Sequence, residues 1–142
     1  AYTQEWLSQQ IVEKATDAII FADTEGIIRL WNSGAEGIFG YSADEAIGQS
    51  LDLIVPEKMR KRHWEGYHKV MATGKTKYCK GTLAVPAITK SDNRISIEFT
   101  IVLVTSDSGE PLGTAAVIRD VTERWQKQKE LKKRLAALEG KD

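Results

Sequence analysis

Turn sequences divide this chain into short apolar runs, and that division restricts the fold more than any other feature of the sequence. Residues 18–22 and 27–31 are runs of β-forming residues on either side of a turn that ends in Gly26, which predicts a hairpin. Three further strand-like stretches follow later, separated by polar turns: residues 78–85, 94–105 and 112–119. Strands at both ends with helices between them favour an α+β fold, in which helices cover one face of a five-stranded antiparallel sheet.

Helix signals fill the region between the two groups of strands. Asn32 can cap a short helix that Gly40 stops, and Ser42 with Glu45 forms a capping box for one more helical turn. A longer amphipathic helix is predicted over residues 57–73, between a proline and a glycine. These helices are the ones expected to cover the sheet.

Both ends of the chain predict helices outside this core. Residues 5–15 have the loose apolar spacing of an amphipathic helix. Near the other end, Leu131, Leu135 and Leu138 follow at intervals of four and three residues, which is coiled-coil spacing. The repeat is about two heptads long, so a helix folded back on its own sheet remains the alternative to a dimeric stem. We expect three segments: a helical cap over 1–15, a central domain over 16–120 and a C-terminal helix over 121–142.

Composition excludes several classes of protein. Among the 142 residues, 20 Lys and Arg balance 20 Asp and Glu, so net charge predicts no attraction to nucleic acid or to a membrane. The single cysteine, Cys79, rules out an internal disulfide and fits a reducing cytoplasm. No apolar run is long enough to span a bilayer. Nothing groups Ser, His and Asp or pairs carboxylates near a pocket, so we expect no enzyme.

Several phrases, in this order along the chain, resemble the PAS family. They are residues 17–23 (DAIIFAD), 25–26 (EG), 31–36 (WNSGAE), 39–42 (FGYS), 45–49 (EAIGQ) and 118–123 (IRDVTE). The resemblance covers about residues 12–123 and implies the PAS fold, with an interior pocket of the kind that binds small ligands. Asp120 and Thr122 lie in the closing phrase, where they can cap the helix that leaves the last strand and relay a signal into it.

A second, partial resemblance concerns residues 56–63 (PEKMRKRH). They are similar to the start of the long helix in haem-binding PAS sensors, which implies His63 as the iron ligand of haem b and Lys69 as a propionate contact. The other positions that this resemblance places in the pocket are Tyr78, Leu83, Phe99 and Ile101. The alternative is that His63 is a surface or capping residue, that no cofactor is bound, and that the apolar positions are core.

Leu83 departs from the oxygen-sensor pattern. Those sensors carry an arginine at this position, facing the iron. Without that donor, oxygen would lose a charge-assisted hydrogen bond worth roughly 1.5–3 kcal/mol. A haem in this pocket is therefore expected to favour carbon monoxide or nitric oxide, or to sense redox state.

Two other chemistries do not fit. A flavin photosensor of the LOV type needs a cysteine on the helix after Gly48, but the residues there are Gln49–Ser50–Leu51–Asp52. A two-histidine zinc site fails because His63 and His68 would point about 140° apart on a helix.

We therefore expect a cytoplasmic sensory module of a signal-transduction protein. It would sense a small ligand, a gas or redox state and relay it through a homodimeric C-terminal helix to an output domain outside this chain. The alternative is a ligand-free PAS domain that acts in dimerisation and protein–protein interaction alone.

Overall fold

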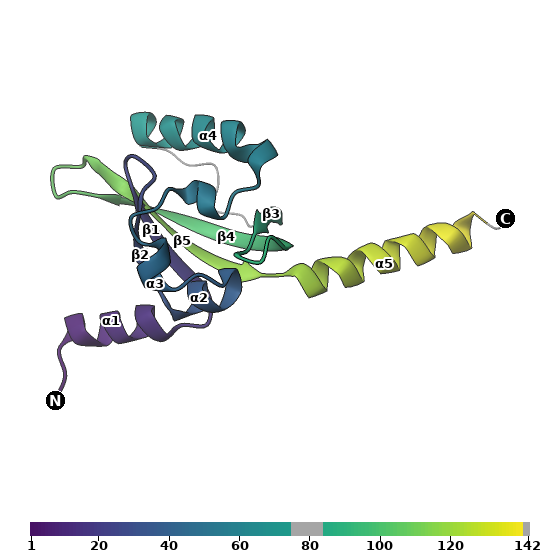
Figure 1. The fold of residues 1–142 in the computed structure, drawn as a ribbon, viewed down its shortest axis with the longest axis horizontal. Helices are drawn as coiled ribbons and strands as arrows, with labels where there is room; N and C mark the ends of the chain where they lie inside the picture. Colours follow the sequence, from purple (N-terminus) through teal and green to yellow (C-terminus); the bar gives the residue numbers. More distant parts are fainter. Residues whose placement is uncertain (75–83, 141–142) are drawn as a thin grey trace.

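The computed structural model describes residues 1–74 and 84–140, and a five-stranded sheet lies at its centre (Figure 1). The strands are β1 (Ala18–Asp23), β2 (Ile28–Trp31), β3 (Val85–Ile88), β4 (Arg94–Thr105) and β5 (Pro111–Asp120). Their order across the sheet is β2-β1-β5-β4-β3, and every neighbouring pair is antiparallel. The predicted α+β fold with a five-stranded antiparallel sheet is confirmed.

Five α-helices surround or leave the sheet (Figure 1). They are α1 (Gln4–Lys14), α2 (Ser33–Phe39), α3 (Ala43–Ala46), α4 (Arg60–Thr73) and α5 (Thr122–Glu139), with short 3-10 turns η1 (Leu51–Leu53) and η2 (Glu57–Met59) before α4. α5 extends away from the sheet as a direct continuation of β5. α1 lies beside α2 at the other end of the chain.

Local signals account for the short helices as expected. The Asn32 side chain accepts a hydrogen bond from the Ala35 amide at the start of α2, and Gly40 ends this helix in the left-handed conformation with φ +83°. Ser42 and Glu45 form the predicted capping box at the start of α3. The sequence pattern of this region is thus sufficient to place its helix boundaries.

The core forms where the inward residues of the strands meet the short helices. Ala18 pairs with Ile118 and Ile20 with Ala116, so these side chains share one face of the sheet. Phe39 from α2 packs into the same cluster and is fully buried. The strand register therefore decides which residues line the covered face.

Two predicted boundaries were wrong. The long helix begins at Arg60 instead of residue 57, because residues 57–59 form a separate 3-10 turn. β3 continues to Ile88, beyond the predicted end of that strand at Val85. It contains Pro86. An edge strand tolerates a proline because the missing N–H can lie on the side of the strand that has no neighbouring strand. Residues 78–83 of the predicted strand lie outside the described residues.

One buried amide joins three segments of the fold. Asn32 has no exposed surface. Its Oδ1 accepts hydrogen bonds from the amides of Ile19 (2.8 Å) and Ala35 (3.0 Å). Its Nδ2 donates to the carbonyls of Val12 (2.7 Å) and Asp17 (3.1 Å). The end of α1, the start of β1 and the start of α2 are therefore fixed to a single side chain.

Replacing this side chain should destabilise the whole domain. Asn32→Ala is expected to cost on the order of 3 kcal/mol of unfolding free energy, since it leaves several buried backbone groups without partners. Urea unfolding followed by circular dichroism measures the loss. Asn93→Ala, in an exposed turn, is the control and should stay within about 0.5 kcal/mol of the original protein. A loss below about 1 kcal/mol for Asn32→Ala would contradict the role given to this amide.

Candidate ligand site between α4 and the sheet

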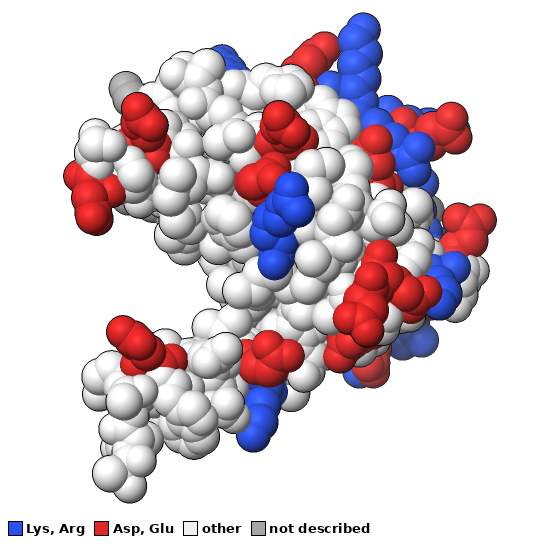
Figure 2. All heavy atoms as spheres, turned by 60° about the vertical axis from the view of Figure 1, so that its left-hand side comes forward, with Lys and Arg blue, Asp and Glu red and all other residues white. Residues whose placement is uncertain are grey.

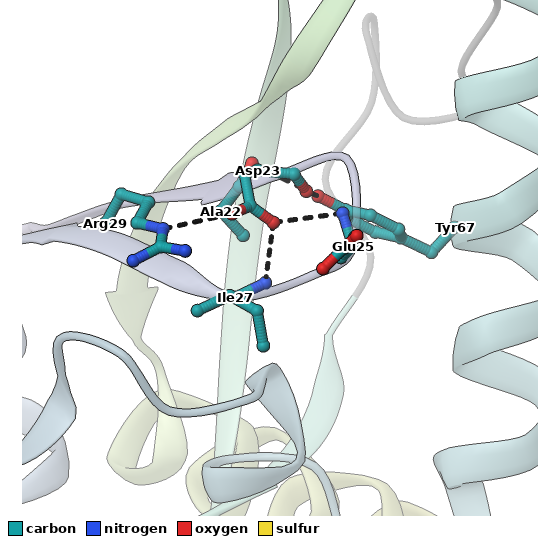
Figure 3. Close-up of polar contacts among 6 residues, drawn as sticks. All are labelled: Ala22, Asp23, Glu25, Ile27, Arg29 and Tyr67. Atoms are coloured by element: carbon teal, nitrogen blue, oxygen red, sulfur yellow. Dashed lines mark hydrogen bonds and ion pairs between the residues drawn. The ribbon is translucent and has the colours of Figure 1, made fainter.

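Tyr67 attaches α4 to the sheet. It is the buried residue of this helix, with 7% of its surface exposed. Its hydroxyl donates to the carbonyl of Ala22 at 3.1 Å and also contacts the carbonyl of Asp23 (Figure 3). Burial raises the pKa of Tyr67, so the hydroxyl keeps its proton and remains a hydrogen-bond donor at neutral pH.

Trp64 attaches the same helix to the turn between β1 and β2. Its indole N–H donates to Asp52 Oδ1 at 2.7 Å. Its ring lies against Gly26, where a Cβ atom would come within 2.1 Å of the ring. Gly26 also has φ +78°, a conformation that favours glycine. Two constraints therefore favour glycine at this position: the turn needs a positive φ, and the Trp64 ring leaves no room for a Cβ atom.

The carboxylate of Asp23 holds this turn in shape. It accepts hydrogen bonds from the amides of Glu25 (2.9 Å) and Ile27 (3.1 Å) and from Arg29 Nε (3.0 Å) (Figure 3). Partial burial opposes the charged form, but the bonds from Ile27, Arg29 and Glu25 outweigh it and lower the pKa of Asp23. Hydrogen bonds within the turn therefore stabilise the conformation against which α4 packs.

His63 lies one helical turn before Tyr67, so both side chains share the face of α4 that meets the domain. The His63 ring contacts Trp64 edge-on at a centroid distance of 4.9 Å and lies 6.0 Å from the Tyr67 ring. Its Nδ1 is buried and has no hydrogen-bond partner among the residues that the structure describes. Burial lowers the pKa of His63, against the opposing charge of Asp52. The imidazole is therefore neutral at neutral pH and offers a nitrogen lone pair.

The other predicted site residues fall into three groups. Phe99 and Ile101 pair with Ile118 and Ala116 of β5, which places them on the covered face of the sheet. Lys69 is exposed on α4. Two residues, Tyr78 and Leu83, lie outside the described residues.

The sequence did not predict the polar contacts of this region. The amphipathic pattern of residues 57–73 indicates a helix but assigns no polar contact to Tyr67, Trp64 or Asp52. The sequence pattern that could have indicated these contacts was weak. It consisted of two aromatic residues three apart on a helix and a turn glycine against which a ring could pack.

The junction between the sheet and α5 is tied to β4. The Asp120 carboxylate accepts the Thr122 amide at 2.9 Å, but the N-cap residue of α5 is Val121, and no side chain caps this helix at that position. The Thr122 hydroxyl does not cap α5: it accepts the Ser96 amide at 2.9 Å and donates to Asp120 at 2.6 Å. Arg124 pairs with Glu98, a contact the sequence did not predict. The exit direction of α5 is thus set by β4 as well as by β5.

Across residues 1–74 and 84–140, no three His, Cys, Asp or Glu side chains group so that they could hold a metal ion. Nor does any helix in the described part of the chain have the length and apolar character that a membrane crossing requires.

The sequence matches known signalling proteins. Sensor protein FixL from Bradyrhizobium diazoefficiens is 34% identical over 132 residues, which are 91% of this chain and 25% of that protein. The cell-division control histidine kinase PdhS from Brucella ovis is 27% identical over 120 residues, 84% of this chain and 11% of that protein. The chain thus spans a quarter or less of the length of these relatives.

Solved structures share the fold. A PAS domain from Colwellia psychrerythraea has a TM-score of 0.74 at 22% identity, over 85% of this chain and 99% of that one. A sensory box histidine kinase/response regulator from Burkholderia thailandensis has a TM-score of 0.66 at 18% identity, over 93% and 97%. A family model of the PAS fold matches residues 7–121. The chain therefore belongs to the PAS family and is a sensory domain of the kind found in signalling proteins such as FixL and PdhS.

Proposed function

We propose that this PAS domain senses a gas, a redox state or another small ligand at the face of α4 that meets the domain, and that haem b, held by His63, is the sensing group. The observation that carries the proposal is the buried Nδ1 of His63, for which the described part of the chain provides no hydrogen-bond partner. A buried polar atom without a partner is costly in a folded protein. The cost is understandable if the imidazole is kept for a ligand.

The donor set suits haem. A neutral imidazole is a common axial ligand of haem iron, and burial keeps His63 neutral by lowering its pKa. Phe99 and Ile101 supply apolar surface on the covered face of the sheet, and Lys69 is available to a propionate. Tyr78 and Leu83, which the resemblance to haem-binding PAS sensors also assigns to this pocket, lie outside the described residues. When bound, haem iron supplies a centre that binds diatomic gases or changes its oxidation state.

Removal of the His63 imidazole should abolish haem retention. Protein expressed with added haem precursor is expected to show an intense Soret band. His63→Ala should lose that band on gel filtration, because the iron then has no protein ligand. His68→Ala is the matched control, since His68 is exposed on the same helix, and it should retain the band.

The absence of a Soret band in haem-supplemented original protein would reject the haem proposal. So would equal haem retention in His63→Ala and His68→Ala. Either result favours a ligand-free PAS domain that acts through protein contacts alone.

We also propose that the domain forms a homodimer through its terminal helices. α5 has no buried residue, and Leu131, Leu135 and Leu138 are each more than half exposed. α1 likewise buries none of its side chains, and Trp6 and Ile11 are exposed on it. Figure 2 shows α1 standing out from the body across a hollow in the surface. A second copy would cover these apolar side chains.

Charges on the leucine stripe should weaken this dimer. The double variant Leu131→Glu, Leu135→Glu is expected to raise the dissociation constant at least about tenfold, because it removes apolar contacts and places like charges together. Sedimentation equilibrium measures the change. Gln126→Glu with Ala136→Glu adds the same charge on the opposite face of the helix and should leave the constant unchanged. Equal effects of the two double variants would move the contact away from α5.

The remaining part of the proposal is the relay from the sheet into α5. Asp120 and Thr122 form it. Ser96 of β4 is bonded to Thr122, and Glu98 of β4 pairs with Arg124 in the first turn of α5. A ligand that binds two arrangements of the sheet unequally can shift α5 by no more than that difference in affinity. The output domain of the parent protein would then respond to the stem.

Loss of the Asp120 carboxylate should loosen the first turn of α5 without unfolding the domain. Asp120→Ala removes the acceptor of the Thr122 amide, a loss of about 1 kcal/mol. Amide exchange over the first turn of α5 is expected to rise about fivefold, while the melting temperature changes little. Asp107→Ala, in the exposed turn between β4 and β5, is the control. Unchanged exchange in Asp120→Ala would argue against the relay.

A further inference from the structure

The Tyr67 hydroxyl ends on the sheet at the place where β1 and β5 pair. Its acceptors are the carbonyls of Ala22 and Asp23, the last two residues of β1. These two residues pair with Thr114 and Gly113 of β5. Thr114, a buried residue that is 8% exposed, lies near enough to the hydroxyl to influence the pKa of Tyr67. One side chain of α4 is therefore bonded to β1 at the residues that pair with β5.

Gly113 leaves no room for a side chain at this place. A Cβ atom at Gly113 would lie 2.0 Å from the carbonyl oxygen of Ala22, and Gly113 has φ +154°. The backbone at this point has little free space, so it cannot absorb a displacement of its neighbours by local rearrangement. A shift of Ala22 must therefore move Gly113.

The other hydrogen bonds from the first half of α4 end elsewhere. Arg60 donates to the carbonyls of Val55 (3.1 Å) and Asp52 (3.3 Å), and Trp64 donates to the Asp52 side chain. Those bonds hold the helix to the loop that precedes it. The Tyr67 bond differs because it ends on β1, which pairs with β5, and β5 continues into α5 after Asp120.

We propose that Tyr67 is a positioning residue for signalling: its hydroxyl transmits the position of α4 to β5, and so to the strand that carries the stem. The inference rests on the proposed sensing function, since a ligand at His63 would act on α4 one turn away from Tyr67. The ring of Tyr67 serves packing, whereas the hydroxyl serves the coupling.

A double-mutant cycle read by amide exchange tests the coupling without any ligand. Trp64→Phe removes the bond to Asp52 and loosens α4. It should speed exchange in α4 about fivefold and, through Tyr67, at Gly113 and Thr114 about threefold. In the Tyr67→Phe background, Trp64→Phe should still loosen α4 but should have no further effect on Gly113 and Thr114. A merely structural hydroxyl would give the same factor at Gly113 and Thr114 in both backgrounds, which would overturn the proposal.

Two controls make the cycle decisive. Tyr41→Phe removes a hydroxyl from a tyrosine that packs on Trp31 in the core cluster, and the effect of Trp64→Phe on β5 should persist in that background. If Tyr67→Phe fails to fold, Thr114→Val replaces it, because it removes the hydroxyl of the β5 residue that pairs with Ala22 and leaves the tyrosine intact. Persistence of the Trp64→Phe effect at Gly113 in Thr114→Val would also reject the inference.

Hemin supplies the second measurement. Binding of hemin to the original protein is expected to change exchange at Gly113 and in the first turn of α5. In Tyr67→Phe, the Soret band should persist while the change in exchange is lost. Failure of hemin to bind the original protein rejects the proposed ligand, whereas the ligand-free cycle separately decides the role of Tyr67. An unchanged hemin response in Tyr67→Phe contradicts the coupling itself.

Discussion

The buried amide of Asn32 is the interaction on which the arrangement of the domain depends. An amide in an apolar core is tolerated only when its donors and acceptors are paired. Here the partners come from the end of α1, the start of β1 and the start of α2. The hydrogen bonds of this one side chain therefore hold the three segments together. One of them is β1, which pairs with β5 along residues 18–23.

Signals that act within a few residues were enough to predict much of the fold. The left-handed glycine at Gly40 and the capping box of Ser42 and Glu45 depend only on neighbours in sequence, and both appear as expected. The apolar run of residues 18–22 likewise predicted a strand, and in the structure its side chains alternate between buried and half-buried. The boundary of β3 was misjudged because Pro86 suggests a break, and only the position of this strand at the edge of the sheet makes the proline harmless.

Contacts between distant segments left no comparable trace in the sequence. His63 was identified as a candidate from a local phrase, but the features that make its imidazole unusual come from its surroundings in the fold. Tyr67 meets Ala22 across 45 positions of the chain, and Arg124 meets Glu98 across 26. No periodicity encodes such a meeting, because it depends on where a helix and a strand come to lie. The Thr122 hydroxyl illustrates the same limit: its residue type suits a cap, yet the nearby Ser96 amide of β4 takes its lone pair.

The exposure of α5 affects how many of its residues are helical at a given time. Its first turn is fastened to β4, but its later turns are covered by nothing within the described part of the chain. A helix of this length is only marginally stable in water on its own. Mass action then determines how helical α5 is. A partner that covers the leucines stabilises the helical form more as its concentration rises relative to its dissociation constant. The stem would lengthen as its partner becomes more abundant and fray as it is diluted. The amount of protein in its surroundings would thus act as a second input beside the ligand.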